Sequence, residues 1–355
     1  MKALRLTMVG VYPPPYGGVS IHVQRLLAGC LENNIQAAVF DLSLRSKKSA
    51  NVLNFFWNWP RLFFGHYDII HVHTVNRSWQ VPWLFGILAR LKRAGFVVTY
   101  HSLRYRPEDF SRLGRRMTKV VLKSASCCVT INAVIRERLV ALGAPPGKVS
   151  VVSPYLPPLV KQEEITAVPP SVWTFIAAHR PVISANAFAI IRDKGVDLYG
   201  IDMCVELCAA LKKLYPAVGL VFFLPDIRDY EYFHELKRRI AEKGIGDNFL
   251  FQTRPCQLYP VIMKSDIFVR PTVVDSYGVS VAEAIHFKVP AVASDVCLRP
   301  EGAVLFKRRD EADFIRCVKA VWENHPDFKA KLETAGPVSA LGDILAIYRA
   351  LSPPR

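Results

Sequence analysis

Short hydrophobic runs that alternate with longer amphipathic segments are the feature of this chain that most constrains its fold. In the first half, the hydrophobic runs predict strands at residues 4–11, 37–41, 69–73, 97–101, 128–131 and 149–152. The amphipathic segments predict helices at residues 81–93, 112–123 and 133–141, and one more helix that starts near Val19. Strands that alternate with helices pair into a parallel sheet with helices on both faces.

The second half of the chain repeats this pattern. Its predicted strands are residues 182–185, 219–223, 249–252, 266–269 and 291–294, and its predicted helices are residues 202–214, 230–243 and 279–287. A chain of 355 residues is too long for one typical core, and the proline-rich segment 153–171 is typical of a hinge or linker. We therefore predict two doubly wound α/β domains, residues 1–155 and 156–340, and a final short helix within residues 341–355.

The segment Arg270–Asp295, RPTVVDSYGVSVAEAIHFKVPAVASD, carries the clearest functional signal. Asp275 and Glu283 lie on either side of Gly278, in a loop and helix start between two predicted strands. Such a loop lies at the carboxyl edge of a parallel sheet, where ligands bind. Backbone N–H groups at a helix start hold phosphate, and carboxylates accept hydrogen bonds from hydroxyl groups. The segment predicts a ligand with both groups, such as a nucleotide sugar.

The same segment resembles a known family. Asp275-x7-Glu283, followed by Ala284 and the strand 290–294, is similar to the E-x7-E signature of the retaining "group 1" glycosyltransferases of GT-B fold, which include sucrose synthase and phosphatidylinositol mannosyltransferase. The resemblance implies that Glu283 binds the nucleotide ribose and that Asp275, one methylene shorter than the family's Glu, lies over the donor sugar. We place Tyr277, Gly278 and Val279 in the same donor site.

The resemblance also implies an architecture. It predicts a GT-B fold, in which two Rossmann-like domains face a cleft and the last helix packs back on the N-terminal domain. The N-terminal domain would then hold the acceptor, and the C-terminal domain would hold the nucleotide-sugar donor.

Paired glycines follow the first predicted strand. Gly17 and Gly18 open a predicted helix, where glycine lets backbone approach a phosphate closely. The spacing is not the dinucleotide fingerprint G-x-G-x-x-G, and an ordinary strand–helix turn is the alternative. With His22, the segment is similar to the family pattern PPxxGGxxxHV. That similarity implies that both glycines lie against the donor diphosphate or the acceptor.

Histidines mark the ends of two other predicted strands. His101 ends the strand 97–101, where the family has a TxHD-like element whose His lies near the transferred sugar, and Ser102 replaces the family's Asp or Gly. We therefore predict a catalytic role for His101. His71 and His73 share one face of a strand, because side chains alternate. A zinc site with His101 lacks a carboxylate or cysteine ligand at suitable spacing, so we predict no metal.

Cations for the donor diphosphate are expected near the start of the second domain. The family supplies them in the pattern GR-x-x-x-x-KG. This chain has Lys194 and Gly195 but no arginine directly after the strand 182–185, and Arg192 lies close by. We predict Lys194 as a catalytic cation and Arg192 as a donor-binding residue. A solvated loop charge is the alternative for Lys194.

Positive charge is concentrated in the first half. Residues 1–155 hold 21 Lys and Arg against 6 Asp and Glu, whereas residues 156–355 hold 25 against 24. Aromatic and apolar stretches at residues 55–64 and 83–88, with seven cations in residues 104–123, favour binding to anionic lipid. A solvated basic face over an ordinary core is the alternative. No helix-turn-helix, RNA-binding signature or zinc finger indicates nucleic acid.

Location follows from what the sequence lacks. The eight cysteines show neither a C-x-x-C pair nor a disulfide-like spacing, so we expect them to be small core residues in a reducing cytosol. The first residues predict a strand rather than a signal peptide, and no apolar run reaches the ~18 residues that span a bilayer. We expect a cytoplasmic protein, peripheral on the inner face of the cytoplasmic membrane.

The family resemblance thus implies a retaining hexosyltransferase. It would move a sugar from a nucleoside-diphosphate sugar, its co-substrate, to a lipid-linked or polysaccharide acceptor, without a metal or other cofactor. The segment 197–207 and the sequence SPYLPP are similar to a bacterial polysaccharide-type subset, which implies a role in cell-envelope polysaccharide biosynthesis. A nucleotide-sugar epimerase of the same fold and a non-catalytic sugar-binding relative are the alternatives.

Overall fold

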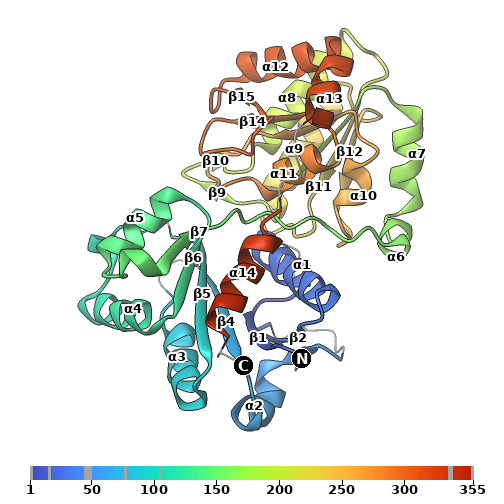
Figure 1. Ribbon diagram of the computed structural model, residues 1–355. Coiled ribbons are helices and arrows are strands. Elements are labelled where there is room, and N and C mark those ends of the chain that lie inside the picture. The colour runs from blue at the N-terminus through green and yellow to red at the C-terminus, as the bar shows by residue number, and fades with distance from the viewer. Residues whose placement is uncertain are drawn as a thin grey trace. The chain divides into compact units, whose positions relative to one another are not determined.

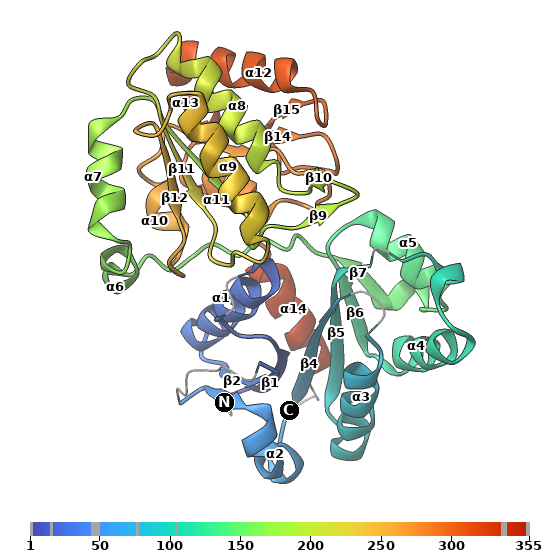
Figure 2. The same ribbon diagram turned by 180° about the vertical axis from the view of Figure 1, so that it is seen from behind.

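The computed structural model describes residues 3–14, 17–43, 50–75, 78–103, 105–334 and 339–352. Pro15, Tyr16 and Arg104, which belong to segments singled out in the sequence, lie outside the described residues. The chain divides into a first unit, Met1–Leu159 with Ser339–Arg355, and a second unit, Val160–Val338. Each unit is a parallel sheet with helices on both faces (Figures 1 and 2).

The sheet of the first unit contains seven strands among the described residues. They are β1 (Arg5–Gly10), β2 (Gln36–Asp41), β3 (Val52–Asn54), β4 (Ile69–Val75), β5 (Gly95–Ser102), β6 (Cys127–Thr130) and β7 (Val149–Val151). All neighbours pair in parallel, in the order β3-β2-β1-β4-β5-β6-β7. The chain leaves β1 toward one side of the sheet and returns at β4 on the other, so the topological switch point lies between β1 and β4.

Six α-helices cover this sheet in the described part of the first unit. They are α1 (Gly18–Glu32), α2 (Phe55–Phe64), α3 (Gln80–Lys92), α4 (Arg112–Ser124), α5 (Ala133–Ala141) and α14 (Leu341–Leu351). Alternate strand residues pack on opposite faces. Ile69 and Val97 point to the face that α1 and α14 cover, whereas Ile70 and Val98 point to the face that α2, α3, α4 and α5 cover.

The final helix, α14, is part of the first unit although it follows the second unit in the sequence. Figures 1 and 2 show it beside α1. Tyr348 is fully buried, and its hydroxyl lies 2.6 Å from Nδ1 of His71 on β4. The Ala340 N–H donates to the carbonyl oxygen of Tyr155 at 3.0 Å. The last helix therefore completes the core on one face of the first sheet.

The sheet of the second unit contains six strands among the described residues. They are β8 (Val182–Asn186), β11 (Gly219–Phe223), β12 (Phe249–Gln252), β13 (Ile267–Arg270), β14 (Ala291–Ser294) and β15 (Val304–Phe306). All pair in parallel, in the order β12-β11-β8-β13-β14-β15. The switch point of this sheet lies between β8 and β13. A separate antiparallel hairpin joins β9 (Arg192–Asp193) and β10 (Val196–Asp197).

The second unit has eight α-helices among its described residues, and seven of them pack on the faces of the sheet. They are α6 (Gln162–Thr166), α7 (Pro170–Ala178), α8 (Ile201–Lys212), α9 (Tyr230–Glu242), α10 (Tyr259–Ile262), α11 (Val279–His286), α12 (Glu311–Glu323) and α13 (His325–Thr334). One face packs against α8, α9 and α12. The other packs against α7, α10, α11 and α13.

The predicted class of two parallel-sheet α/β domains is confirmed, and most predicted strands lie within one or two residues of the observed ones. Some elements were not predicted, including α12. Asp310 caps this helix by accepting from the Asp313 N–H, and Phe314, Cys317, Val318 and Val321 are buried along one side. That spacing is the ordinary signal of an amphipathic helix.

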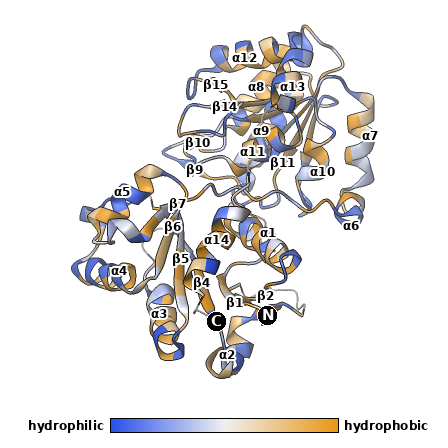
Figure 3. Cartoon of the chain, viewed as in Figure 1, coloured by the Kyte–Doolittle hydropathy of each residue, from blue (hydrophilic) through white to orange (hydrophobic). Residues whose placement is uncertain are grey.

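Large hydrophobic residues are exposed at several places on the first unit, and α2 carries the most exposed of them. Figure 3 shows hydrophobic colour along α2, where Trp57 and Phe64 are each 83% exposed. No helix among the described residues combines the length and the apolar character needed to cross a bilayer.

The contact between Tyr348 and His71 gives a prediction about stability. Tyr348→Phe removes the hydroxyl and leaves a buried imidazole nitrogen unpaired, which should lower the free energy of unfolding of the first unit by about 1–3 kcal/mol. Tyr230→Phe is the matched control, because Tyr230 is 63% exposed. Equal unfolding midpoints for both variants in urea would show that the hydroxyl of Tyr348 does not stabilise the fold.

Candidate functional site

The carboxyl ends of β8 and β13 meet at the switch point of the second sheet. Asn186 is the last residue of β8 and Arg270 is the last residue of β13. The Arg270 Nη1 donates to both the backbone oxygen and the side-chain oxygen of Asn186, at 3.0 and 3.1 Å. The Arg270 guanidinium also lies 5.5 Å from the ring centroid of Tyr199. Ligands of open α/β sheets bind at this position.

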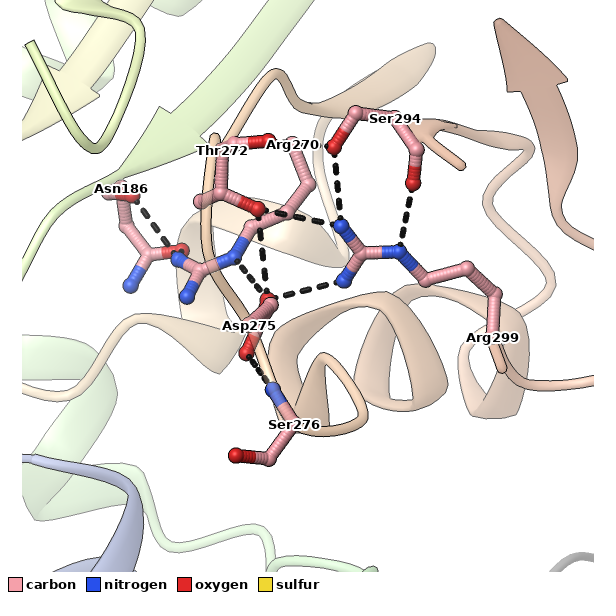
Figure 4. Close-up of polar contacts among 7 residues, drawn as sticks. All are labelled: Asn186, Arg270, Thr272, Asp275, Ser276, Ser294 and Arg299. Carbon is pink, nitrogen blue, oxygen red and sulfur yellow. Dashed lines mark hydrogen bonds and ion pairs between the residues drawn. The ribbon is translucent and has the colours of Figure 1, made fainter. Parts of the chain in front are cut away.

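Asp275 is the centre of the polar contacts at this edge (Figure 4). Its Oδ2 accepts from Nε of Arg270 at 3.1 Å and from Nη1 of Arg299 at 2.8 Å. Its Oδ1 accepts from the Ser276 N–H at 2.9 Å. We call Asp275, Arg270 and Arg299 the arginine–aspartate hub. Two guanidinium groups against one carboxylate give the hub a net charge of +1.

Arg299 comes from the loop after β14, and its side chain is only 1% exposed. Its Nε donates to the backbone oxygen of Ser294 at 2.9 Å. Its Nη2 donates to the hydroxyl oxygens of Thr272 and Ser294, both at 3.0 Å. These bonds fix the guanidinium in place, so Arg299 is the buried and immobile member of the hub.

The protonation state of Asp275 follows from these neighbours. Burial alone would raise the pKa of this carboxyl, since its side chain is only 15% exposed. Arg270, and then Arg299, outweigh burial and hold the pKa of Asp275 well below its usual value. The carboxylate is therefore ionised at every pH at which the protein is expected to work.

Gly278 is required where it stands. Its φ of 89° lies in the left-handed region, and a Cβ at this position would lie 2.6 Å from Nη1 of Arg299. Gly278 is the N-cap of α11 and offers no side chain to cap the helix. The first N–H groups of a helix have no intrahelical acceptor. The start of α11 therefore presents donors beside the hub, at the carboxyl edge of the sheet.

The other predicted donor-site residues of this segment lie close by in the sequence. Val279 is the first residue of α11, and Tyr277 immediately precedes the N-cap; both are half-buried. Glu283 lies one turn into α11 and is only 4% exposed. A carboxylate that is buried at this depth is unusual. Its predicted role on the nucleotide ribose stays a prediction.

The two predicted cations lie on the β9–β10 hairpin. Lys194 and Gly195 form its two-residue turn, with φ of 49° and 81°, and the Lys194 side chain is exposed. Arg192 pairs with Asp229 at 2.7 Å and lies over the ring of Tyr232. The predicted roles of Lys194 and Arg192 remain predictions. The hub contains neither of them.

In the first unit, the predicted glycines open α1 beside the switch point. Gly17 is the N-cap, and its N–H donates to Oγ of Ser20 at 3.0 Å. Gly18 is exposed, and a Cβ there would meet no atom within 4 Å. The start of α1 therefore has open space next to its backbone at Gly18, as a phosphate that binds at a helix start requires. The predicted contacts of Gly17 and Gly18 with donor or acceptor remain predictions.

His101, the predicted catalytic residue of this unit, belongs to a cluster of buried histidines. Its Nε2 lies 3.0 Å from Nδ1 of His73 on β4, and its ring centroid lies 4.8 Å from that of His22 on α1. The ring centroid of His71 lies 4.1 Å from that of His73 with the rings tilted, and His71 forms hydrogen bonds with Tyr348 and Thr99. The cluster connects the α1 start, where Gly17 and Gly18 lie, to the end of β5.

Burial keeps these histidines neutral. It lowers the pKa of His22 to about 4 and that of His71 to about 3. The pKa values of His73 and His101 also lie well below the usual value, first because of burial and then because of the neighbouring imidazoles. The cluster therefore offers neutral hydrogen-bonding groups rather than cations.

Sequence reasoning missed Arg270, Arg299 and Asn186. Arg270 had a signal, because it directly follows the hydrophobic run of β13 and therefore lies at the carboxyl edge. Arg299 had none, since it lies 24 residues from Asp275 in a loop of no special pattern. His22 was recognised only as part of the glycine pattern, and its contact with His101 depends on how α1 packs on the sheet.

Two protein-family models match the chain. The model of the glycosyl transferase 4-like domain matches residues 48–154, in the first unit. The model of glycosyl transferases group 1 matches residues 193–324, which include the hub. No curated protein sequence matches the chain significantly.

Solved structures resemble the whole chain at low sequence identity. A glycosyltransferase from Rickettsia africae ESF-5 has a TM-score of 0.70 at 13% identity, over 99% of this chain and 99% of that one. HepE from Anabaena in complex with UDP has a TM-score of 0.68 at 13% identity, over 98% and 100%. Sucrose-phosphate synthase from Thermosynechococcus elongatus has a TM-score of 0.63 at 14% identity, over 98% and 96%. The predicted GT-B fold is confirmed.

The hub gives a prediction about stability. Asp275→Asn keeps the size of the side chain but leaves the buried Arg299 without its counter-ion. Removing one partner of a buried ion pair costs about 3–5 kcal/mol, so the second unit should unfold at a much lower urea concentration. Asp226→Asn is the control, because Asp226 pairs with Arg228 at the surface and such pairs contribute at most ~1 kcal/mol.

The difference in stability between Asp275→Asn and wild type should become smaller in acid. A carboxyl whose pKa is lowered by folding stabilises the folded state above its unfolded pKa of ~3.9, and this stabilisation is lost as the pH falls toward the folded value. The difference in unfolding free energy between wild type and Asp275→Asn should be full at pH 7 and should shrink below pH ~4. A difference in unfolding free energy that is as large below pH ~4 as at pH 7 would contradict the ion-pair account.

Proposed function

The chain belongs to the group 1 glycosyltransferases, and we propose that it transfers a hexose from a nucleoside-diphosphate sugar to a lipid-linked or polysaccharide acceptor with retention of configuration. The donor diphosphate would bind at the arginine–aspartate hub, and the acceptor would bind the first unit. The observation that carries this proposal is the hub itself, which holds a net positive charge next to the uncapped start of α11.

A diphosphate is the group that this arrangement suits. Arg270 has a largely buried guanidinium, 13% exposed, at the edge of the sheet. Helix N-termini favour anions because the first N–H groups lack partners and the helix dipole is positive there. Charge that develops on a departing nucleoside diphosphate would be stabilised by such fixed groups. Asp275 would hold Arg270 in position as well as face the donor sugar.

Other residues keep the roles that the family resemblance implies. Glu283 would bind the ribose, and the neutral imidazole of His101 would bind hydroxyls of the transferred sugar. Lys194 and Arg192 would contribute further positive charge to the diphosphate, and Gly17 and Gly18 would leave room for the diphosphate or the acceptor. The proposal needs no metal or cofactor, because guanidinium and N–H groups supply the positive charge.

The role of Glu283 is open to a direct test with UDP and UDP-glucose, the ligands of HepE from Anabaena. Glu283→Gln should weaken UDP binding in calorimetry by about 1.5–3 kcal/mol, the usual value of a hydrogen bond to a charged group. Glu301→Gln, at an exposed glutamate of the same unit, should bind UDP as wild type does.

A 2′,3′-dideoxy analogue of UDP sharpens this test. The analogue lacks the ribose hydroxyls, so Glu283→Gln should not weaken its binding. If the variant loses equal affinity for both nucleotides, Glu283 does not contact the ribose. If it loses none for either, the donor does not bind at this segment, and the proposed donor site is wrong.

We further propose that the first unit binds the acceptor at an anionic membrane surface. Trp57, Trp59 and Phe64 lie exposed along α2. Lys92 on α3 donates to the backbone oxygens of Phe63 and Gly65, both at 2.6 Å, so the ends of the two helices lie together. We call the exposed side chains of these two helices the apolar surface of α2 and α3; its residues are Phe56, Trp57, Trp59, Phe63, Phe64 and Leu91.

Exposed cations lie on the same two helices and on the neighbouring helix. Arg61 lies on α2, and Arg90 and Arg93 lie at the end of α3. The neighbouring helix α4 adds five exposed cations, which are Arg112, Arg115, Arg116, Lys119 and Lys123. Exposed aromatic residues beside cations match the interface of an anionic bilayer. This supports a peripheral position on the inner face of the cytoplasmic membrane, where lipid-linked acceptors and nucleotide sugars meet.

Vesicle binding tests the membrane proposal. The protein should bind vesicles with anionic lipid more tightly than neutral ones and should dissociate as salt rises, because the Debye length is only ~10 Å at 0.1 M. Trp57→Ala with Trp59→Ala should weaken binding to vesicles but leave UDP affinity unchanged. Leu298→Ala is the matched control, since Leu298 is 80% exposed on the second unit. Equal binding to neutral and anionic vesicles would contradict the role of the cations.

A further inference from the structure

Three buried histidines meet at the carboxyl edge of the first sheet. His22 lies on α1, His73 on β4 and His101 on β5, and each offers a ring nitrogen that lies within 4.8 Å of the other two. All three residues are more than nine-tenths buried. The sequence had suggested a different trio, with His71. The structure instead pairs His71 with Tyr348 and Thr99, so His71 has no nitrogen to offer.

One nitrogen of His22 has its role fixed by its surroundings. Nδ1 lies 2.8 Å from the carbonyl oxygen of Pro154, which can only accept, so Nδ1 carries the hydrogen. Nε2 therefore carries the lone pair. Among the described residues, neither Nε2 of His22 nor Nε2 of His73 has a hydrogen-bond partner, although both are buried. Buried polar atoms nearly always have a partner.

The hydrogen bond of His22 resembles the second hydrogen bond that histidine metal ligands usually make. Histidine ligands usually donate their second N–H to a carbonyl or carboxylate, which fixes the tautomer and orients the ring. The bond from His22 to Pro154 has this form. His73 and His101 share one hydrogen over 3.0 Å. A cation bound by Nδ1 of His73 and Nε2 of His101 would replace this shared hydrogen. The hydrogen would then move to the other nitrogen of the imidazole that carries it.

We propose that His22, His73 and His101 bind one divalent transition-metal ion, with Zn²⁺ as the best fit. Zinc binds histidine nitrogen at ~2.0–2.1 Å in tetrahedral geometry, which puts ligand nitrogens about 3.4 Å apart. The three ring nitrogens lie within 4.8 Å of one another, so side-chain shifts of about an ångström would bring them to the spacing that zinc requires. Imidazole ligands without a carboxylate suit zinc, copper or nickel and disfavour magnesium and calcium. Three ligands leave the fourth position open.

The ion would act as an inhibitor of transfer rather than as a cofactor. It would use a lone pair of His101, the residue that the proposed function assigns to the sugar, so this consequence depends on that proposal. Metal binding itself does not depend on it. The two ideas can therefore fail separately, one in a binding experiment and the other in a transfer assay.

Titration of the chelator-treated protein with Co²⁺ and Zn²⁺ tests the site. Wild type should bind one Co²⁺ per chain, with the strong visible absorption of a tetrahedral ion, and Zn²⁺ should displace it. His22→Ala, His73→Ala and His101→Ala should each weaken binding by more than about 100-fold, since even the loss of an outer-shell partner costs 10–100-fold. His66→Ala should bind as wild type, because His66 is exposed on the same unit.

Other results would overturn the proposal. They are the absence of a stoichiometric, tetrahedral Co²⁺ complex in wild type, unchanged affinity in the three variants, or loss of affinity in His66→Ala. Circular dichroism checks that each variant folds. If a strand variant does not fold, His22→Gln decides, because it replaces a helix residue and leaves β4 and β5 intact.

Discussion

The ion pairs of Asp275 with Arg270 and Arg299 are the interaction on which the second unit's functional edge depends. Through them, the end of β13, the loop after β14 and the start of α11 are held in one arrangement, and Arg270 extends it to Asn186 on β8. Two buried guanidinium groups are costly without a counter-ion. A single carboxylate offsets only one of them. The remaining positive charge is what an incoming anion would neutralise.

The two sheets have the same kind of switch point but opposite chemistry there. In the second unit the switch point is cationic, because the hub carries two guanidinium groups. In the first unit it is lined by neutral imidazoles, because burial lowers the pKa values of His22, His73 and His101. A diphosphate is best held by fixed positive charge, whereas sugar hydroxyls need neutral donors and acceptors. The first switch point therefore offers uncharged hydrogen-bonding groups, and the second offers fixed positive charge.

The sequence alone predicted most strands of both sheets and placed Asp275 in the loop after β13, at the carboxyl edge of the second sheet. Parallel strands are buried on both faces and form continuous hydrophobic runs, so 182–185 and 291–294 were recognised directly. The cations were harder. Lys194 matched the family pattern, yet it lies at the exposed turn of a hairpin, whereas Arg270 and Arg299 surround Asp275. Arg270 and Arg299 are 29 residues apart and both reach Asp275 only because β13 pairs with β14, and no local pattern encodes that arrangement.

The electrostatics of both switch points is insensitive to pH near neutrality. Arg270 and Arg299 keep the pKa of Asp275 below its usual value, so the hub keeps its charge well into the acid range. The pKa of His22, at about 4, is also too low for protonation near pH 7. Between pH ~6 and ~8 the carboxylate of Asp275 and the buried imidazoles of the first switch point therefore each keep one protonation state. Fixed charges of this kind are preorganised, because no group has to move or change its protonation state to present them.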